Sequence, residues 1–393
     1  MPSEAMPPEV APRWDVVVTA GGTGGHVLPA LAVVEELVAR GVGRDRIGFL
    51  GGRRGIEGEA VPAAGISFRG LDVRGLRRGF SWAAIAANVS ALWAMLRAVR
   101  AARGILHASG AGVVVAMGGY ASVPAVLAAR RRSRRLVVYE SNSVPGVATK
   151  LAARRATVTT CALESTVALL PRAQRIGFVV RRPLERFGTD PALVEDLAAE
   201  ARAVYGIDAA RRVVVVMGGS QGAHSLNEAV LGLAREWRDR DDLAVVHLVG
   251  RREIDAVLEA ARPLEGSALT YVPIGFEDHI DRVYAVCDLM VCRAGASTCA
   301  ELAATGTAAV CVPYPHATAD HQRLNAEALA AAGAAAVLPD AAVSAASLAE
   351  CVGTLLSEPH RLGAMQAAAA ALGAADGAAL LAERVIGLLG EAA

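Results

Sequence analysis

Two unbroken apolar runs, each followed by a glycine turn and a helical pattern, divide the chain into two similar halves. The first run begins after Asp15 and leads into Gly21-Gly-Thr-Gly-Gly25, and the second begins after Arg212 and leads into Gly218-Gly-Ser-Gln-Gly222. Strands that are apolar throughout are typical of parallel sheets covered by helices on both faces. A strand, a glycine loop and a helix form the start of a Rossmann-like unit. The pattern therefore predicts two such units.

Shorter apolar runs alternate with helical patterns inside each half. They cover residues 47–51, 113–116 and 136–140 in the first half, and residues 244–250, 289–292 and 308–313 in the second. Alternating strands and helices predict a doubly wound α/β sheet in each half. We place the boundary between Pro171 and Arg212, where the pattern restarts. Residues 359–393 are rich in alanine and have helical periodicity without a strand.

Length and composition limit the class of protein. The chain has 393 residues, 53% of them hydrophobic and 20% charged, so it is too apolar for a disordered chain and long enough for two domains. Forty basic and 39 acidic residues leave a formal charge of +1, which gives no reason to expect a nucleic-acid partner. Residues 1–12 carry acids and prolines without an apolar core, so we expect a disordered tail rather than a signal peptide or a membrane anchor.

The six cysteines and the acidic clusters give no indication of a metal centre. No cysteine forms a Cys-x-x-Cys pair or stands at finger spacing from a histidine, so we expect buried thiols in a reducing cytosol. The acidic run at residues 239–242 has no supporting histidine, and we interpret it as a solvated turn. The sequence therefore predicts neither a metal site nor a cofactor.

One long uncharged stretch, residues 79–96, raises the question of a membrane span. It is slightly shorter than the ~20 apolar residues that a span requires and contains polar residues, so we expect no transmembrane helix. Its apolar residues include Phe80, Trp82 and Trp93, and arginines flank it on both sides. An apolar patch with tryptophans and a basic rim is typical of contact with an anionic membrane surface. The alternative is a helix whose apolar face packs in the core.

The two glycine loops are candidate anion sites. A glycine loop that leads into a helix offers backbone N–H groups and the positive end of the helix dipole, which suits a phosphate. Neither loop has the lysine of a P-loop, and neither has the ribose-binding acid of a dinucleotide fingerprint at the usual offset. Two loops in matched positions predict two phosphate-bearing ligands. The alternative is that both are only tight turns between a strand and a helix.

His26 and Glu301 are candidate site residues at the starts of helices. His26 closes the first loop, where an imidazole can accept a proton from an attacking hydroxyl group; it could equally cap the helix or donate to a phosphate. Glu301 lies about one turn into the helix after the strand at 289–292, where a carboxylate suits ribose hydroxyls. Stabilisation of the helix dipole alone is its alternative role.

Taken together, these motifs resemble those of the MurG family, which transfers N-acetylglucosamine from UDP-N-acetylglucosamine to undecaprenyl-diphospho-muramoyl-pentapeptide in peptidoglycan synthesis. The matching segments are residues 21–26, 75–79, 117–120, 218–222, 293–301 and 322–325, and the resemblance runs from Trp14 to the last helix. It implies the GT-B fold: two Rossmann-like, doubly wound parallel-sheet α/β domains that face a cleft. Residues 14–180 would bind acceptor and membrane, residues 181–360 would bind the UDP-sugar, and a helix at about 361–393 would return to the first domain.

The resemblance also assigns roles by position. The donor-contacting positions would be Arg181, Ser220, Glu277, Ala296, Ser297, Thr298, Glu301 and Gln322 in the second half, with Thr23, Gly24, Gly25 and Asn142 from the first. Ser220 would lie near the donor diphosphate, Glu301 would hold the ribose, and the backbone of Glu277 would contact uracil. The acceptor, catalytic and membrane positions would be His26, Tyr120, Glu140, Phe80, Trp82 and Trp93. The implied location is the cytoplasmic face of the cell membrane, with peripheral contact.

The implied chemistry is inverting glycosyl transfer, in which the muramoyl C4 hydroxyl attacks the anomeric carbon as UDP leaves. A single displacement needs one base and no enzyme nucleophile, and we expect His26 as the base, with Glu140 as the second choice. Backbone N–H groups of residues 218–222, together with Arg181, would stabilise the charge that develops on the leaving diphosphate. This arrangement requires no bound metal.

Two segments depart from the family pattern. The chain has Tyr139-Glu-Ser-Asn142 where the family usually has His-Glu-x-Asn, and Gly177-Phe-Val-Val-Arg181 where it usually has Gly-Asn-Pro-Val-Arg. Three alternatives therefore stay open. The chain could be a related GT-B transferase with another lipid or natural-product acceptor, a UDP-N-acetylglucosamine 2-epimerase, or a binding protein that keeps only the nucleotide pocket.

Overall fold

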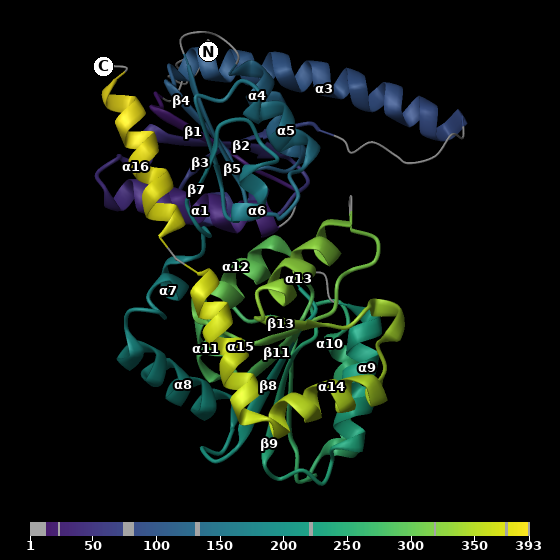
Figure 1. Ribbon diagram of the computed structural model, residues 1–393. Coiled ribbons are helices and arrows are strands. Elements are labelled where there is room, and N and C mark those ends of the chain that lie inside the picture. The colour runs from purple at the N-terminus through teal and green to yellow at the C-terminus, as the bar shows by residue number, and fades with distance from the viewer. Residues whose placement is uncertain are drawn as a thin grey trace, which may run out of the picture. The chain divides into compact units, whose positions relative to one another are not determined.

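The computed structural model describes most of the chain and divides it into two compact units. It describes residues 13–22, 24–73, 82–129, 134–219, 223–317, 320–373 and 376–391, with the backbone alone for residues 82–86. Unit 1 groups the residues up to Glu140 with Pro145–Ile176 and the segment from Ala378 onward. Unit 2 groups Ser141–Val144 with Gly177–Gly377. Each unit is a separate α/β body with its own sheet (Figure 1).

Unit 1 is built on a seven-stranded parallel sheet with the order β3-β2-β1-β4-β5-β6-β7. Its strands are β1 (Val16–Thr19), β2 (Ile47–Gly52), β3 (Ser67–Leu71), β4 (Val113–Ala116), β5 (Arg135–Glu140), β6 (Val158–Cys161) and β7 (Ala173–Arg175). Its helices are α1 (Gly24–Ala39), α2 (Glu57–Ala63), α3 (Trp82–Ser109), α4 (Val123–Ala128), α5 (Val147–Ala153), α6 (Glu164–Val167) and α16 (Gly377–Gly390), with short 3₁₀ turns η1 (Arg44–Arg46) and η2 (Tyr120–Ser122).

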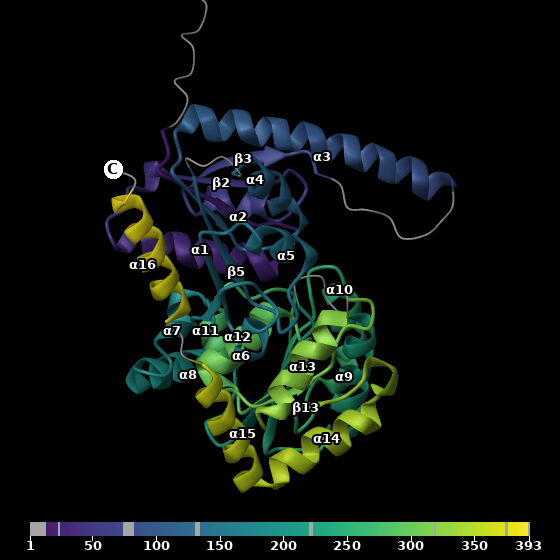
Figure 2. The ribbon, with the colours of Figure 1, turned by 45° about the horizontal axis from the view of Figure 1, so that its top comes forward.

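The apolar runs place the strands of unit 1 in its core. All residues of β1 and β4 are buried, because helices cover both faces of a parallel sheet. The ring of Trp14 packs against β2 at Gly48, where a Cβ atom would overlap the indole. Glycine is therefore required at this position of the strand. The long helix α3 packs on α4 and extends past it in both ribbon views (Figures 1 and 2).

Unit 2 repeats this design on a six-stranded parallel sheet with the order β10-β9-β8-β11-β12-β13. Its strands are β8 (Arg212–Met217), β9 (Leu243–Leu248), β10 (Thr270–Ile274), β11 (Leu289–Cys292), β12 (Ala309–Cys311) and β13 (Ala335–Val337). Its helices are α7 (Arg182–Glu185), α8 (Pro191–Tyr205), α9 (His224–Glu236), α10 (Ile254–Ala261), α11 (Ile280–Val286), α12 (Ala296–Thr305), α13 (His321–Ala331), α14 (Ala345–Ser357) and α15 (Pro359–Leu372), with 3₁₀ turns η3 (Arg262–Leu264) and η5 (Asp340–Ala342).

Both sheets have the strand order of a Rossmann fold, with the first strand of each unit third from one edge. The prediction of two doubly wound parallel sheets is therefore confirmed. In such sheets ligands bind beyond the carboxyl ends of the strands, where the strand order reverses. Gly21 and Gly22 after β1, and Gly218 and Gly219 after β8, lie at this point in their own units.

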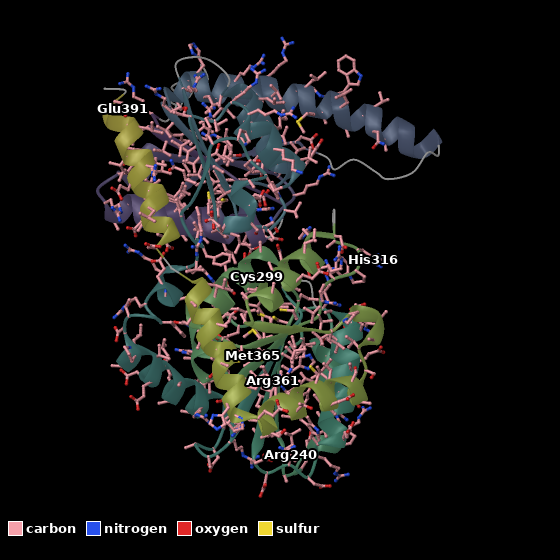
Figure 3. The ribbon with its side chains drawn as sticks, in the orientation of Figure 1. Arg240, Cys299, His316, Arg361, Met365 and Glu391 are labelled. Atoms are coloured by element: carbon pink, nitrogen blue, oxygen red, sulfur yellow. The ribbon has the colours of Figure 1, made fainter. Side chains whose placement is uncertain are left out.

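The observed units differ from the expected domain bounds in three places, the first of which is the boundary itself, at Gly177 rather than at Arg181. The whole of α15 lies in unit 2, where it packs against α12; Gly306, after α12, lies close to Ala370, and Gly373, after α15, lies close to Ala303. Figure 3 shows Cys299 on α12 and Met365 on α15 within this unit. Only the segment from Ala378 joins unit 1, whereas the return was expected from about residue 361. The short segment 141–144 groups with unit 2, through hydrogen bonds that Ser143 makes.

Candidate functional site

In unit 2, the candidate site is built around the first turns of α12. The turn after β11 leads directly into this helix, whose first residues are Ala296, Ser297 and Thr298. The first N–H groups of a helix have no partner within it, and they carry the positive end of its dipole. The hydroxyl oxygen of Ser297 is buried and has no hydrogen-bond partner among the described residues. The start of α12 therefore presents polar donors.

The carboxylate of Glu301 lies in the second turn of α12 and is held by two other side chains. One guanidinium nitrogen of Arg181 donates to its Oε1 at 3.4 Å, and the hydroxyl of Tyr284 donates to its Oε2 at 3.0 Å. The residue is 7% exposed. Burial raises the pKa of Glu301, and the charge of Arg181 and the hydrogen bond from Tyr284 oppose that rise. The side-chain partners give this carboxylate a fixed orientation, which dipole stabilisation alone would not require.

Arg181 reaches Glu301 from the N-cap position of α7. Its Nε–H group is buried and has no partner among the described residues. The guanidinium as a whole is 31% exposed, so part of it remains accessible. Arg181 and Glu301, predicted as donor-contacting residues from separate motifs, are thus brought together.

Sequence reasoning missed Tyr284, which lies on α11. Its side chain is 3% exposed, and its hydroxyl is bonded to Glu301 across 17 positions of the chain. No local pattern distinguishes this tyrosine from an aromatic residue that only fills the core. The contact between Tyr284 and Glu301 follows only from the packing of the fold, which brings these residues of α11 and α12 together.

A polar cluster fastens the turn before α12 to the start of α9. The guanidinium of Arg293 donates to Asp340 and, at 3.1 Å, to Oγ of Ser225. The hydroxyl of Ser225 in turn donates to Asp340 at 2.9 Å. This cluster therefore connects the start of α9 with the segment that leads into α12. Ser220, expected near the donor diphosphate, lies outside the described residues.

Glu277, expected to contact uracil through its backbone, follows β10 and uses its side chain to fix the turn. Its Oε2 accepts a hydrogen bond from the hydroxyl of Tyr205 at 2.8 Å, and its Oε1 accepts one from the backbone N–H of His279 at 2.8 Å. Phe276 beside it is 45% exposed and lies under the guanidinium of Arg251, 4.1 Å from the ring centroid. The turn after β10 is therefore held by the hydrogen bonds of Glu277 and by the contact of Phe276 with Arg251.

Gln322 and Asn142 belong to the same unit as Glu301. The side-chain oxygen of Gln322 accepts a hydrogen bond from the backbone N–H of Tyr314 at 2.9 Å. The amide of Asn325 donates to Oδ1 of Asn142 at 3.3 Å and to the carbonyl of Ala294 at 3.2 Å. Asn142 was expected to contribute from the first half of the chain. The structure instead groups its segment with unit 2.

In unit 1, the candidate site lies where β1 and β4 end. Gly24 and Gly25 open α1, and His26 is its third residue. The imidazole lies against the turn after β4, because a Cβ atom at Gly118 would be 3.1 Å from two atoms of the ring. The backbone of Gly118 has a φ of +95°, a conformation that favours glycine. Glycine at this turn therefore makes room for His26.

Tyr120 and Glu140 flank this edge of the sheet. Tyr120 begins η2 and is 36% exposed, and burial of its hydroxyl raises its pKa. Glu140 ends β5 and is 2% exposed. Its Oε2 accepts a hydrogen bond from the backbone N–H of Gly146 at 3.1 Å, where α5 begins. Glu140, the second candidate base, therefore stabilises the turn that leads into α5 in unit 1. Thr23 lies outside the described residues.

A second residue that sequence reasoning missed, Glu57, lies beneath the first glycine loop. It is fully buried, and its Oε1 accepts hydrogen bonds from the N–H of Gly52 at 2.8 Å and of Gly22 at 3.4 Å. A Cβ atom at Gly21 would overlap its carboxylate. The N–H of Gly22 is therefore directed at Glu57, so the loop does not offer that group to a phosphate.

Comparison with known proteins decides the family. The sequence matches the glycosyltransferase family 28 N-terminal domain over residues 16–160 and the glycosyltransferase family 28 C-terminal domain over residues 213–381. A UDP-N-acetylglucosamine–N-acetylmuramyl-(pentapeptide) pyrophosphoryl-undecaprenol N-acetylglucosamine transferase from Acidothermus cellulolyticus is 39% identical, over 94% of this chain and 96% of that protein. A Mycobacterium bovis protein of the same name is also 39% identical, over 96% of this chain and 89% of its own. The chain belongs to the MurG family.

Solved structures agree with this assignment. The crystal structure of Acinetobacter baumannii MurG is 27% identical in sequence, with a TM-score of 0.74, and the match covers 95% of this chain and 99% of that one. The UDP-N-acetylglucosamine 2-epimerase of Neisseria meningitidis is 12% identical with a TM-score of 0.64, over 95% and 99% of the two chains, which shows a shared fold alone. The GT-B fold is confirmed, and the protein is a glycosyltransferase of the hexosyltransferase class.

The three residues that depart from the MurG pattern all have buried side chains. Tyr139 on β5 is 2% exposed, and Phe178 and Val179 are each 1% exposed. A Cβ atom at Gly377 would overlap the carbonyl of Phe178, so the start of α16 lies close to this residue. All three substituted positions therefore pack inside the protein.

One face of α3 carries exposed apolar side chains, which we call the α3 apolar surface. It consists of Val89, Leu92, Trp93 and Leu96, which are 52%, 60%, 63% and 50% exposed. Their spacing places them on one side of the helix, whereas Ala91 and Ala94 on another side are buried. The sequence left two interpretations open, an exposed apolar patch and a helix packed in the core. Each of them therefore holds for one side of α3. Phe80 and the side chain of Trp82 lie outside the described residues.

No helix in the described ranges has the length and apolar character needed to cross a membrane. In the same part of the chain, no three side chains of histidine, cysteine, aspartate or glutamate are grouped in a way that could hold a metal ion. The cysteines among these residues are free thiols. In the run at residues 239–242, Asp239 is 95% exposed, as expected for a solvated turn.

Proposed function

We propose that this glycosyltransferase moves N-acetylglucosamine from UDP-N-acetylglucosamine to the muramoyl C4 hydroxyl of undecaprenyl-diphospho-muramoyl-pentapeptide, a step of peptidoglycan synthesis. The names of its relatives support this donor and this acceptor. The observation that carries the proposal for the chain itself is the buried carboxylate of Glu301, held by Arg181 and Tyr284 at the start of α12. Such a carboxylate beyond the end of a Rossmann strand is suited to the ribose of a nucleotide.

The donor occupies unit 2 in this proposal. Glu301 accepts the ribose hydroxyls, and the turn around Phe276 and Glu277 borders the base. The N–H groups after β8 and at the start of α12 face the diphosphate, with help from Arg181. Preorganised donors of this kind stabilise the charge that develops on a leaving group, because they need not reorient during the reaction.

The acceptor is activated from unit 1. We propose His26 as the base that removes the proton of the attacking hydroxyl group. Its place at the start of α1, beside the glycine turn after β4, supports this role. Glu140 is the second candidate, but its carboxylate already accepts a backbone hydrogen bond from Gly146. A single displacement inverts the configuration at the anomeric carbon and needs no covalent intermediate.

We also propose peripheral contact with the anionic cytoplasmic face of the cell membrane, through the α3 apolar surface. Three exposed arginines, Arg97, Arg100 and Arg103, follow this surface on the same helix. Apolar side chains next to basic ones suit a bilayer with anionic lipids, where burial and charge attraction act together. A polyprenyl-linked acceptor resides at such a surface.

One assay distinguishes the transferase from its two alternatives. The protein is incubated with radiolabelled UDP-N-acetylglucosamine and a soluble analogue of the lipid acceptor, and the labelled products are separated. Label on the lipid analogue supports the proposal. Labelled N-acetylmannosamine would indicate an epimerase, and nucleotide binding without any product would indicate a binding protein; either result would contradict it.

Transfer is expected to continue in the presence of EDTA. The proposed donors to the diphosphate are backbone N–H groups and Arg181, so no bound cation is required for charge stabilisation. The measurement compares initial rates with and without the chelator, at fixed concentrations of both substrates. Complete loss of activity that magnesium or manganese restores would contradict this expectation.

Replacing Leu92 and Trp93 together with serine should release the protein from anionic vesicles. Both side chains are more than half exposed, at 60% and 63%, so we expect little change in the melting temperature. Vesicle sedimentation measures the bound fraction, which should also fall with salt as the Debye length shrinks below ~10 Å above 0.1 M. Leu258→Ser on α10, 49% exposed in unit 2, is the matched control. Unchanged vesicle binding by the double variant would refute the proposed surface.

A further inference from the structure

Tyr284 connects two helices of unit 2 through one buried polar contact. Its side chain is 3% exposed, and its hydroxyl donates to Oε2 of Glu301 at 3.0 Å. A buried hydroxyl without a partner is costly, so the contact fixes both side chains. Burial and the neighbouring Glu301 raise the pKa of Tyr284 well above its usual value, so the phenol remains a donor throughout the physiological range.

The carboxylate of Glu301 keeps part of its acceptor capacity. Each carboxylate oxygen has two lone pairs, and the structure uses one on Oε1 for Arg181 and one on Oε2 for Tyr284. One lone pair therefore remains on each oxygen. Two acceptor positions on neighbouring oxygens match the two vicinal hydroxyls of a ribose.

The two partners hold the carboxylate unequally. The contact from Arg181 is 3.4 Å long, and this side chain is 31% exposed. The contact from Tyr284 is shorter and buried. Rotation of the carboxylate about its last bond is therefore restricted mainly by the tyrosine hydroxyl.

We infer that Tyr284 is a positioning residue for donor recognition: its hydroxyl holds the Glu301 carboxylate in the orientation in which the remaining lone pairs accept the ribose hydroxyls of the donor. This inference rests on the proposed function, which assigns the ribose to Glu301. Tyr284 itself does not touch the donor. It acts through the carboxylate that does.

Tyr284→Phe tests the inference, because it removes one oxygen atom and keeps the ring. Titration calorimetry on the full chain measures the affinity for UDP and for 2′,3′-dideoxy-UDP, which lacks both ribose hydroxyls. We expect the variant to bind UDP about 10-fold more weakly, as for loss of one hydrogen bond to a charged group. Its affinity for the dideoxy analogue should match that of the unaltered protein.

Tyr271→Phe is the matched control in the same unit. It also removes a tyrosine hydroxyl, one that is hydrogen-bonded to the ring of His247 at 2.8 Å. We expect it to bind both nucleotides as the unaltered protein does. A melting curve for each variant shows whether it is folded. If Tyr284→Phe does not fold, Glu301→Gln is measured instead: its amide has one acceptor oxygen, and it should lose the preference for UDP over the dideoxy analogue.

The dependence of UDP binding on pH gives a second readout. The groups that oppose the burial-raised pKa of Glu301 are Arg181, from the N-cap of α7, and Tyr284, from α11. Without the tyrosine hydroxyl the pKa of Glu301 rises further. Ribose binding needs the charged carboxylate, so it is present above that pKa and is lost below it. Affinity for UDP should therefore begin to fall at a higher pH in Tyr284→Phe than in the unaltered protein.

The outcomes separate this inference from the proposed function. If the unaltered protein prefers UDP to the dideoxy analogue, Glu301→Ala abolishes the preference and Tyr284→Phe keeps it in full, the inference is overturned and the role of Glu301 stands. Equal weakening of both nucleotides by Tyr284→Phe also overturns it, because the hydroxyl would then act on the fold. If the unaltered protein shows no preference, the proposed ribose contact itself fails.

Discussion

Glu301→Ala is expected to raise the KM for UDP-N-acetylglucosamine by about 10–150-fold. A hydrogen bond to a charged group contributes about 1.5–3 kcal/mol, and the substitution removes the carboxylate that accepts the ribose hydroxyls. Initial rates at varied donor concentration and saturating acceptor measure the effect. The substitution leaves Arg181, which is 31% exposed and can be hydrated, and the buried hydroxyl of Tyr284 without their acceptor, so a melting curve must show that the variant is folded.

The control for this variant is a glutamate in the same unit that lies outside the site. Glu259 on α10 is 65% exposed and pairs with Arg262, and Glu259→Ala should leave the KM unchanged. A KM for Glu301→Ala equal to that of the unaltered protein would rule out the ribose role. The carboxylate would then serve only to join α12 to α7 and α11.

The second large effect is expected at His26. If its imidazole removes the proton of the attacking hydroxyl, His26→Ala should lower kcat by roughly 10²–10⁴-fold, the usual contribution of a positioned base. The donor KM should change little, since the donor is assigned to unit 2. In the unaltered protein the rate should fall on acidification, because a protonated imidazole cannot accept a proton. Steady-state kinetics across pH measure all three quantities.

Other results at His26 would assign it a different role. If the imidazolium binds the acceptor diphosphate, His26→Ala should raise the acceptor KM, and acidification should help rather than hinder. If kcat and both KM values are unchanged, His26 is a structural residue and the base is Glu140. His107→Ala, at the exposed end of α3 in the same unit, controls for the loss of a histidine.

The sequence predicted those strands and helices whose pattern of apolar residues and glycines is visible within a short stretch of the chain. β1 and β8 are apolar at nearly every position because both faces of a parallel sheet are covered, and glycine turns follow both strands. The edge strand β3 escaped prediction, since its burial is only partial and Arg69 interrupts its apolar residues. The end of unit 2 was also missed. The alanine-rich pattern is continuous there, and only the packing of α15 against α12 separates it from α16.

Only those residues of the candidate site that belong to a recognisable sequence motif could be predicted. Glu301 follows a strand and a glycine turn, and its helix can be recognised in the sequence alone. Tyr284 and Glu57 are different, because Tyr284 contacts a residue 17 positions away and Glu57 reaches the first glycine loop 35 positions away. Their roles depend on which helices and turns the fold places together. A tyrosine in a short helix or a glutamate just before a glycine gives no local sign of such a contact.

The linkage formed in the product tests the central claim most directly. The account predicts that the chain joins N-acetylglucosamine to the C4 hydroxyl of the muramoyl sugar with inversion, so that the α-linked donor gives a β-linked disaccharide. Nuclear magnetic resonance of the product made on a soluble lipid-acceptor analogue reports both the anomeric configuration and the position of the bond. A β-(1→4) disaccharide is the predicted result. An α linkage, or attachment at any other hydroxyl, would contradict the account.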